Sequence, residues 1–263
     1  MEQKPEGLTF WDHLDELRGC LFRVIAVVIV FGMVAFCMKN MLFDIVLAPR
    51  SSDFITYRLL GVEPFTVGLM NIGLTEQFMI HLKTALYAGF LVASPYVIYE
   101  LFRFISPALY ENEQRYAMRV VGSAYVMFII GTLVNYFLIF PLTVRFLGTY
   151  QVNEEVANML TLQSYMDTLL TMSVMMGIVF ELPVLSWLLA LLGVLKDQYM
   201  QQYRNEAIVA ILIVSAVITP TTDAFTLLIV AIPIWLLYEI SILIVRISQK
   251  NENQNSHTQD QYA

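Results

Sequence analysis

The sequence predicts an all-α membrane protein with six transmembrane helices and with both the N-terminus and the C-terminus in the cytoplasm. Of its 263 residues, 58% are hydrophobic and 14% are charged, whereas soluble domains average about 45–50% apolar and about 25% charged. The apolar residues gather in six runs separated by polar segments, which is typical of a chain that crosses lipid repeatedly. This composition excludes an ordinary soluble domain of the same length.

The expected membrane domain covers residues 1–248, and a polar, disordered tail is expected at 249–263. The six spans are expected at about residues 21–43, 78–102, 120–144, 168–195, 207–218 and 225–245. The fifth run has only a dozen apolar residues and reaches about 18 Å, less than the roughly 30 Å hydrocarbon core. We therefore expect a thinned bilayer or a tilted neighbour there, with Asp223 capping the sixth span after a tight connection.

Charge sets the expected orientation. With six spans, ten lysines and arginines fall on the side of the N-terminus and five on the other side. Lysine and arginine are more frequent in cytoplasmic loops, so we expect both chain ends in the cytoplasm. The first twenty residues are polar and acidic rather than those of a cleavable signal peptide, so we expect the first apolar run to be a retained anchor.

An acidic cluster precedes the first span in "FWDHLDELRGCLFR", Phe10 to Arg23. Its apolar residues recur every three or four positions, which predicts an amphipathic helix leading into the membrane. The acids of this helix, among them Glu16, are expected on its polar side. A solvated helix at the membrane interface is the alternative explanation of the same pattern.

A second acidic cluster lies in "RFISPALYENEQRY", Arg103 to Tyr116, between the second and third spans. Pro107 ends or turns the chain, and Glu111 and Glu113 follow it. These acids would also suit a helix N-terminus. Two acidic clusters on one membrane face predict a basic ligand, because carboxylates pair best with guanidinium groups.

Glu181 raises a different question, because "MGIVFELPVLSW", Met176 to Trp187, otherwise reads as the middle of a span. A charge at the bilayer centre costs on the order of 3 kcal/mol on insertion scales. Pro183 is expected to kink the helix nearby. Glu181 is thus interpreted as a neutral acid bonded to polar neighbours, as a contact for a partner helix, or as a proton site. Glu100 and Glu239, near span ends, are expected to be partly hydrated.

Other chemistries lack the necessary residues. The three histidines are scattered without metal-ligand spacing. No nucleophile–base pair and no glycine-rich phosphate loop is recognisable, so we expect no enzyme activity, no cofactor and no metal. The net charge of −7 argues against nucleic-acid binding. Cys20 and Cys37 lie about 25 Å apart on one helix and cannot form a disulfide with each other.

Six segments in order resemble the TatC family, the multispan receptor component of the twin-arginine protein translocase. They are "HLDELR" at His13, "LAP" ending at Pro49, "SPYVIYELFRFISPALYENE" at Ser94, "YFLIFPL" at Tyr136, "GIVFELPV" at Gly177, and "ITPTTD" with "AIPIWLLYEI" near the end. The resemblance departs at Cys20, where the family usually has an arginine for which Arg23 could substitute, and at Leu227, where a glutamine is common.

The resemblance implies a cupped six-helix bundle in the bacterial cytoplasmic membrane that binds twin-arginine signal peptides of folded cargo. It implies that Glu16, Arg18, Phe104 and Glu113 belong to the signal-binding surface. It relates Glu181 to contacts with the single-span partners TatA and TatB, or with one subunit serving both roles. It also implies self-association and transport driven by the proton gradient. Structural roles are expected for four residues, Pro49, Pro107, Pro183 and Asp223.

A proton-coupled small-molecule transporter with Glu181 as the carrier is the alternative function. Such a transporter would normally need further polar residues at the same depth and an internal repeat. Neither is evident in the sequence, so the receptor is the preferred hypothesis.

Overall fold

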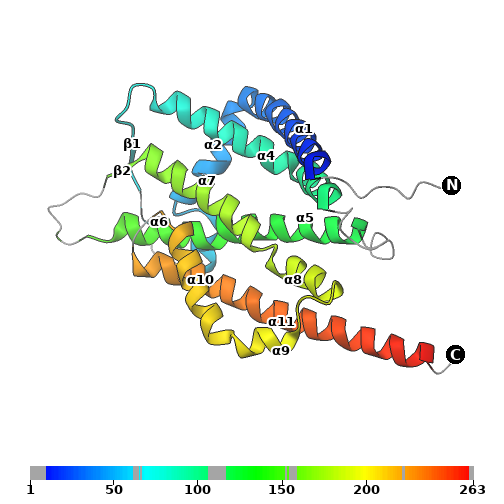
Figure 1. Cartoon of the computed structure of the whole chain (residues 1–263). Helices are drawn as coiled ribbons and strands as arrows, with labels where there is room; N and C mark the ends of the chain where they lie inside the picture. The colour runs from blue at the N-terminus through cyan, green and yellow to red at the C-terminus, as the bar shows by residue number, and fades with distance from the viewer. Residues whose placement is uncertain are drawn as a thin grey trace. The chain divides into compact units, whose positions relative to one another are not determined.

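Long helices carry most of the chain in the computed structural model, and a short parallel pair of strands joins two connections (Figure 1). The structure describes residues 10–61, 65, 67–105, 117–151, 153, 159–220 and 223–260. The elements are α1 (Phe10–Cys37), α2 (Lys39–Leu47), a 3₁₀ turn (Ala48–Arg50), α3 (Ile55–Leu59), β1 (Leu69–Met70), α4 (Glu76–Ile105), α5 (Ala117–Val134), a π-helical turn (Asn135–Ile139), α6 (Phe140–Thr149), β2 (Leu160–Thr161), α7 (Leu162–Val179), α8 (Leu182–Leu191), α9 (Asp197–Gln202), α10 (Arg204–Ile218) and α11 (Ala224–Asp260).

The chain divides into two units, which are described separately. The first unit consists of Met1–Phe43 and His81–Tyr125, and the second consists of Asp44–Ile80 and Val126–Ala263. Helices α1 and α4 form most of the first unit. The second unit holds the helices from α6 to α11.

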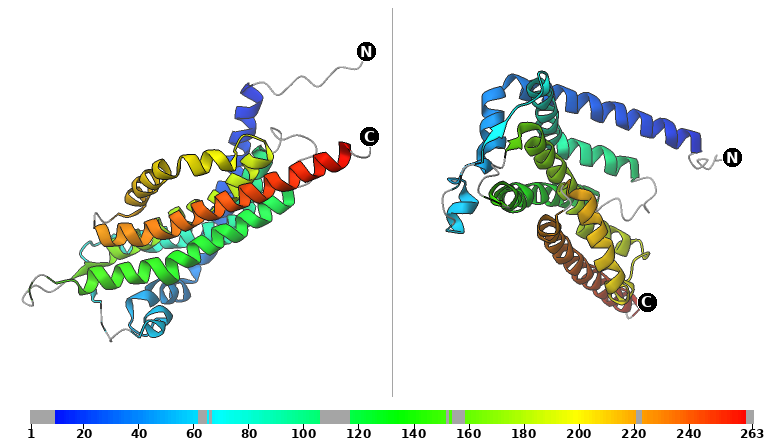
Figure 2. Two further views of the ribbon diagram at one scale, coloured as in Figure 1. Left: turned by 90° about the horizontal axis from the view of Figure 1, so that it is seen from below. Right: turned by 90° about the vertical axis from the view of Figure 1, so that its left-hand side faces the viewer.

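Helices α1 and α4 run side by side in opposite chain directions (Figures 1 and 2). They cross closely at two glycines: a Cβ atom built on Gly89 would lie 2.4 Å from the backbone nitrogen of Gly32 and 2.8 Å from the carbonyl oxygen of Val28. Small residues let membrane helices approach to backbone contact. The crossing therefore depends on the absence of a side chain at Gly89.

The far end of this pair is closed by His81 of α4. Helix α1 ends at Cys37 rather than continuing to residue 43, and the N–H of Met38 bonds the carbonyl of Ala35 at 3.0 Å. His81 Nε2 lies 3.1 Å from the carbonyl oxygen of Phe36, and its ring stacks on the Phe36 ring with centroids 4.0 Å apart. Because a helix end leaves carbonyls unpaired, this contact satisfies one of them.

In the second unit, the Tyr57 hydroxyl ties together two proline-containing turns. Its oxygen lies 2.9 Å from the carbonyl oxygen of Pro49 and 2.8 Å from that of Pro141, and the residue is 1% exposed. Burial raises the pKa of Tyr57 well above its usual range. Beside it, Thr56 Oγ1 donates to the carbonyl of Phe137.

Tyr57→Phe should lower the free energy of unfolding by about 1–3 kcal/mol, because the carbonyls of Pro49 and Pro141 lose the one O–H that they share. Chemical unfolding in detergent measures this change. Tyr199→Phe is the control, since Tyr199 is 53% exposed, and its effect should stay within about 0.5 kcal/mol. Equal stabilities of the two variants would show that the Tyr57 hydroxyl does not hold these turns.

The core of the second unit consists of buried apolar residues from the π-helical turn, from α7 and the turn that precedes α8, and from α10 and α11. They are Ile139, Met172, Met176, Phe180, Ile211, Ile218, Val230, Ala231, Ile234 and Leu237. A side-chain hydrogen bond crosses this region, from Asn135 Nδ2 to Ser173 Oγ at 2.8 Å. Asn135 begins the π-helical turn and is fully buried, so this bond provides a donor–acceptor pair where water is excluded.

The break between α7 and α8 and the end of α8 have local causes. Pro183 has no N–H and its ring opposes the carbonyl four residues earlier, and the helix breaks at Phe180 and Glu181. At the end of α8, Gly193 has φ of +68° and the N–H of Val194 bonds the carbonyl of Leu189 at 3.0 Å, which is a Schellman ending. The helical stretch is thus 162–191 rather than the expected 168–195.

Five helical stretches in the described residues are long and apolar enough to cross a membrane. They are Leu14–Cys37, Glu76–Phe104, Val120–Thr149, Leu162–Leu191 and Ala224–Gln249. Helix α10, the expected short span, has 15 residues and reaches about 22 Å. Helix α11 continues through Asp260 and so includes most of the segment expected to be disordered; extending an existing helix avoids the cost of nucleation.

Candidate functional site

The residues of the first acidic cluster lie on the first turns of α1. Glu16 is half-buried, whereas Asp15 and Arg18 are exposed. The Arg18 guanidinium carbon lies 5.6 Å from the centre of the Phe22 ring, one turn along the helix, at cation–π distance. Leu17, by contrast, is 43% exposed. This end of α1 therefore presents a carboxylate, a guanidinium group and an uncovered apolar side chain together.

The second acidic cluster begins where α4 ends. Phe104 lies in the last turn of α4 and is half-buried. Pro107 and Glu113 lie outside the described residues. The structure thus brings Glu16, Arg18 and Phe104 to the same end of the α1–α4 pair, because the contacts described next join the two helices there.

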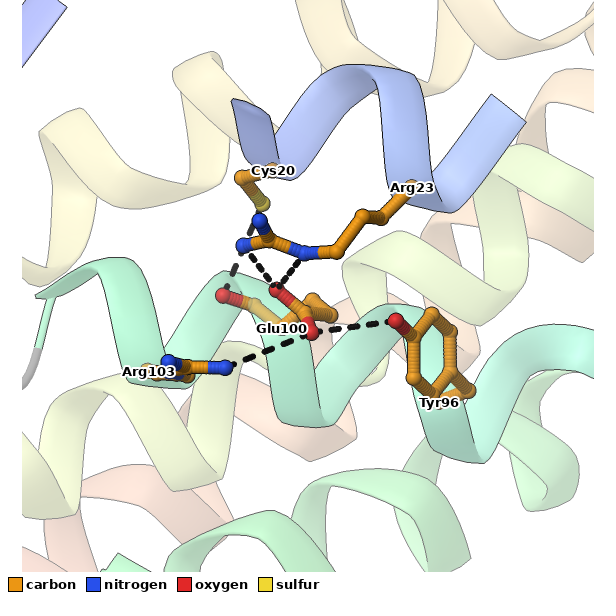
Figure 3. A network of polar contacts seen from close by, with 5 residues as sticks. All are labelled: Cys20, Arg23, Tyr96, Glu100 and Arg103. Carbon is orange, nitrogen blue, oxygen red and sulfur yellow. Dashed lines mark hydrogen bonds and ion pairs between the residues drawn. The ribbon is translucent and has the colours of Figure 1, made fainter. Parts of the chain in front are cut away.

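Glu100 of α4 is the centre of a polar network that sequence reasoning did not find (Figure 3). Arg23 of α1 donates to Glu100 Oε2 from Nε at 3.1 Å and from Nη2 at 2.7 Å. The Tyr96 hydroxyl donates to Oε1 at 3.1 Å, and Arg103 Nη1 lies 3.8 Å from the same oxygen. The Cys20 thiol also donates to the backbone carbonyl of Glu100 at 3.6 Å.

The expectation that Glu100 is partly hydrated is wrong, because its side chain is only 3% exposed. The Arg23 and Arg103 side chains around it are 45% and 60% exposed. A buried carboxylate is costly unless it is paired and hydrogen-bonded, and both of its oxygens are paired here. The available signal was one arginine and one glutamate inside two different apolar runs, near the same membrane interface.

Glu181 lies in the second unit, in the turn between α7 and α8. Its N–H bonds the carbonyl of Ile178 at 3.0 Å and its carbonyl accepts from Leu185 at 2.9 Å, so its backbone is satisfied. Its Oε1 is buried and has no hydrogen-bond partner within the described part of the chain. The interpretation that Glu181 bonds to polar neighbours in the same bundle is therefore not supported for this oxygen.

The other expected structural residues have identifiable contacts. Pro49 is buried in its 3₁₀ turn and accepts the hydrogen bond from Tyr57, and Pro183 is buried near the start of α8. Asp223 Oδ1 accepts from the N–H of Thr226 at 2.7 Å, as a residue that caps α11 does. Glu239 is 26% exposed and pairs with Arg204 at 2.7 Å.

The described residues contain no cluster of side chains suited to binding a metal ion. Groups of three or more His, Cys, Asp or Glu side chains that could hold a metal ion are absent there. Cys20 is buried and Cys37 is exposed, and both are free thiols. The first unit therefore contains a carboxylate paired with guanidinium groups, at Glu100. The second unit contains a buried hydrogen-bond acceptor, Glu181 Oε1, beside a helix break.

Known proteins resemble this chain over nearly its full length. The family model "Sec-independent protein translocase protein (TatC)" matches residues 12–233. The protein of that name from Blattabacterium is 30% identical over 93% of this chain and 97% of its own length, and that of Koribacter versatilis is 32% identical over 98% and 93%. A crystal structure titled as the twin-arginine translocase receptor TatC superposes with TM-score 0.75 and 32% identity, over 90% of this chain and 99% of the other.

Proposed function

Since the chain belongs to the TatC family of Sec-independent protein translocase proteins, we propose that it binds signal peptides with paired arginines at the end of its α1–α4 pair. The chain is a component of a membrane translocase rather than an enzyme. The observation that carries the proposal is the placement of Glu16 and Phe104 at one end of two helices that an ion pair joins.

The recognition chemistry follows from the groups at that end. Glu16 provides a carboxylate there, and a carboxylate binds a guanidinium group through short charge-assisted hydrogen bonds. Glu113, which lies outside the described residues, is proposed to supply a second carboxylate to the same signal peptide. Leu17 and the half-buried Phe104 provide apolar surface at the same end of the pair. A signal peptide presents arginines followed by an apolar segment, so one end of the pair suits both parts. Arg18 contributes by fixing Phe22 and by rejecting a misplaced basic residue.

The same proposal includes the topology and the partners. The chain has six spans, with α10 as the short fifth one, and its ends face the cytoplasm of a bacterium whose inner membrane holds it. Bound signal favours assembly with TatA and TatB, or with one subunit serving both roles, and with further copies of this chain. Folded cargo then crosses at the expense of the proton gradient. The similarity to translocase proteins gives no support to a small-molecule transporter.

Glu16→Ala should weaken binding of a paired-arginine peptide by about tenfold to a hundredfold, because hydrogen bonds to charged groups contribute about 1.5–3 kcal/mol. Fluorescence anisotropy with a labelled signal peptide, on the purified protein in nanodiscs, measures this loss. A peptide with both arginines replaced by lysine should bind the wild type weakly, since lysine lacks the bidentate geometry.

Asp15→Ala is the matched control, because it removes a neighbouring exposed carboxylate and changes the net charge equally. It should bind the peptide within about twofold of the wild type. Equal losses in both variants would mean that bulk charge, and not a site at Glu16, attracts the peptide. Unchanged binding in both Glu16→Ala and Glu113→Ala would refute the receptor site.

A further inference from the structure

Helices α1 and α4 meet most closely at one level, which we call the pivot. The stretch of both helices from this level to the end that carries Glu16 is called the lever. The pivot is the close crossing of Gly32 and Gly89, where backbone meets backbone. Arg23 lies nine residues before Gly32 and Glu100 lies eleven residues after Gly89, which places their contact about 14–17 Å along the helices from the crossing. The crossing alone does not set the angle between the two helices, so contacts further along the helices have to set it.

The proposed signal-binding residues lie still further along the same lever. Glu16 is seven residues beyond Arg23, about 24 Å from the crossing, and Phe104 is one turn beyond Glu100. Opening the pair by about 10° at the pivot would move Glu16 by about 4 Å relative to α4. A carboxylate–guanidinium bond has a heavy-atom distance of about 2.8 Å, so such a movement would separate the site's parts.

The Arg23–Glu100 contact is built to resist that movement. Its Nη2–Oε2 distance is 2.7 Å and its Nε donates to the same oxygen. Glu100 is 3% exposed, and removing one partner of a buried pair leaves an uncompensated charge. Cys20 shares the face of α1 that carries Glu16 and Arg23, and its thiol bonds the Glu100 backbone. A slide or a splay of α1 breaks all of these contacts at once.

We propose that the Arg23–Glu100 ion pair is the positioning contact of the signal-binding surface, holding the α1 turn that carries Glu16 at a fixed distance from the end of α4. The inference rests on the proposed receptor function. The competing idea is that Glu100 itself receives an arginine of the signal and that Arg23 occupies its place beforehand. The 3% exposure of Glu100 disfavours that idea, because an incoming arginine would first have to expel Arg23 from a buried contact.

Binding of the paired-arginine peptide to four variants tests the proposal. Glu100→Gln and Arg23→Gln should each weaken binding by about tenfold, and exchanging the charges in Arg23→Glu with Glu100→Arg should recover most of the loss. Arg204→Gln is the matched control, because Arg204 forms a 2.7 Å pair with Glu239 in the second unit, and its affinity should stay within about twofold of the wild type. Tighter binding by Arg23→Gln would overturn the proposal, since only a competing arginine improves binding when it is removed.

A distance measurement separates this inference from the receptor proposal. Spin labels carried by an unnatural amino acid at Asp15 and Leu101, both exposed, leave Cys20 and Cys37 in place. We expect a narrow distance distribution in the wild type and a broad one in Glu100→Gln, with or without peptide. An unchanged distribution would refute the positioning role even if Glu16→Ala abolishes binding. If Glu100→Gln broadens the distribution but the wild type binds no signal peptide, the receptor proposal is refuted. The Arg23–Glu100 ion pair would then still hold α1 and α4 together.

Discussion

Gly89→Ala is expected to destabilise the first unit by about 3 kcal/mol or more, near the upper end of overpacking substitutions. The new methyl group would lie 2.4 Å from the backbone nitrogen and 2.6 Å from the Cα of Gly32, and 2.8 Å from the carbonyl oxygen of Val28. All three are backbone atoms, so no side-chain rotation can relieve the overlap. Helix α1 would have to move away from α4 as a whole.

Two further glycines make the prediction quantitative. A Cβ on Gly32 would meet a flexible Leu86 side chain at 3.2 Å, and a Cβ on Gly122 of α5 would meet nothing within 4 Å. Gly32→Ala should therefore cost about 1 kcal/mol, and Gly122→Ala should be neutral or stabilise the helix by up to about 1 kcal/mol. Thermal unfolding in detergent ranks the three variants. A Gly89→Ala protein as stable as Gly122→Ala would show that α1 does not lie against α4 at this crossing.

The loss of the crossing should also affect function through the lever. If α1 leaves α4, the Arg23–Glu100 pair is broken and the distance from Glu16 to Phe104 is no longer fixed. Gly89→Ala is thus expected to lose peptide binding together with stability, whereas Glu100→Gln loses binding with a smaller change in the melting temperature. Comparing the two substitutions distinguishes the effect of the Gly32–Gly89 crossing from the effect of the Arg23–Glu100 ion pair.

Local sequence signals predicted most of the helices and several of their ends. Apolar runs marked the spans, and Pro183 marked the break between α7 and α8. The ends were less accurate where a charge was taken as a boundary: Asp167 lies inside α7, because an acid within a helix can find a partner that the sequence pattern does not reveal. The end of α1 is in contact with His81, which lies 45 positions away from Phe36 in the chain, so this contact could not be predicted from local signals.

The pairing of Arg23 with Glu100 could not be predicted from spacing. The two residues are 77 positions apart, and their contact depends on the register of α1 against α4, which the Gly32–Gly89 crossing fixes. Taken one at a time, acids near span ends are expected to be partly hydrated, and Glu100 is one of them. A rule that looks for opposite charges inside different apolar runs would have found the pair.

Glu181→Ala is expected to reduce export of a folded twin-arginine reporter by more than about tenfold, while leaving peptide binding unchanged. Glu181 lies in the second unit, away in the chain from the residues proposed to bind the signal. Its buried Oε1 lacks a partner within the described residues, so a donor from another protein would complete it. Pulse-chase export and crosslinking to single-span partner subunits measure the two consequences.

Stability distinguishes this role from a structural one. A carboxylate oxygen that is buried without a donor lowers stability, so Glu181→Ala should unfold at the same temperature as the wild type or at a higher one. Glu239→Ala is the contrasting control, because it breaks the 2.7 Å pair with Arg204 and should lower stability while export continues. If Glu181→Ala unfolded more easily and Glu181→Gln restored only the stability, the side chain would be part of the fold. Loss of export from a fully stable protein, together with loss of the crosslink to the single-span subunit, would instead support a partner that contacts Glu181 during translocation.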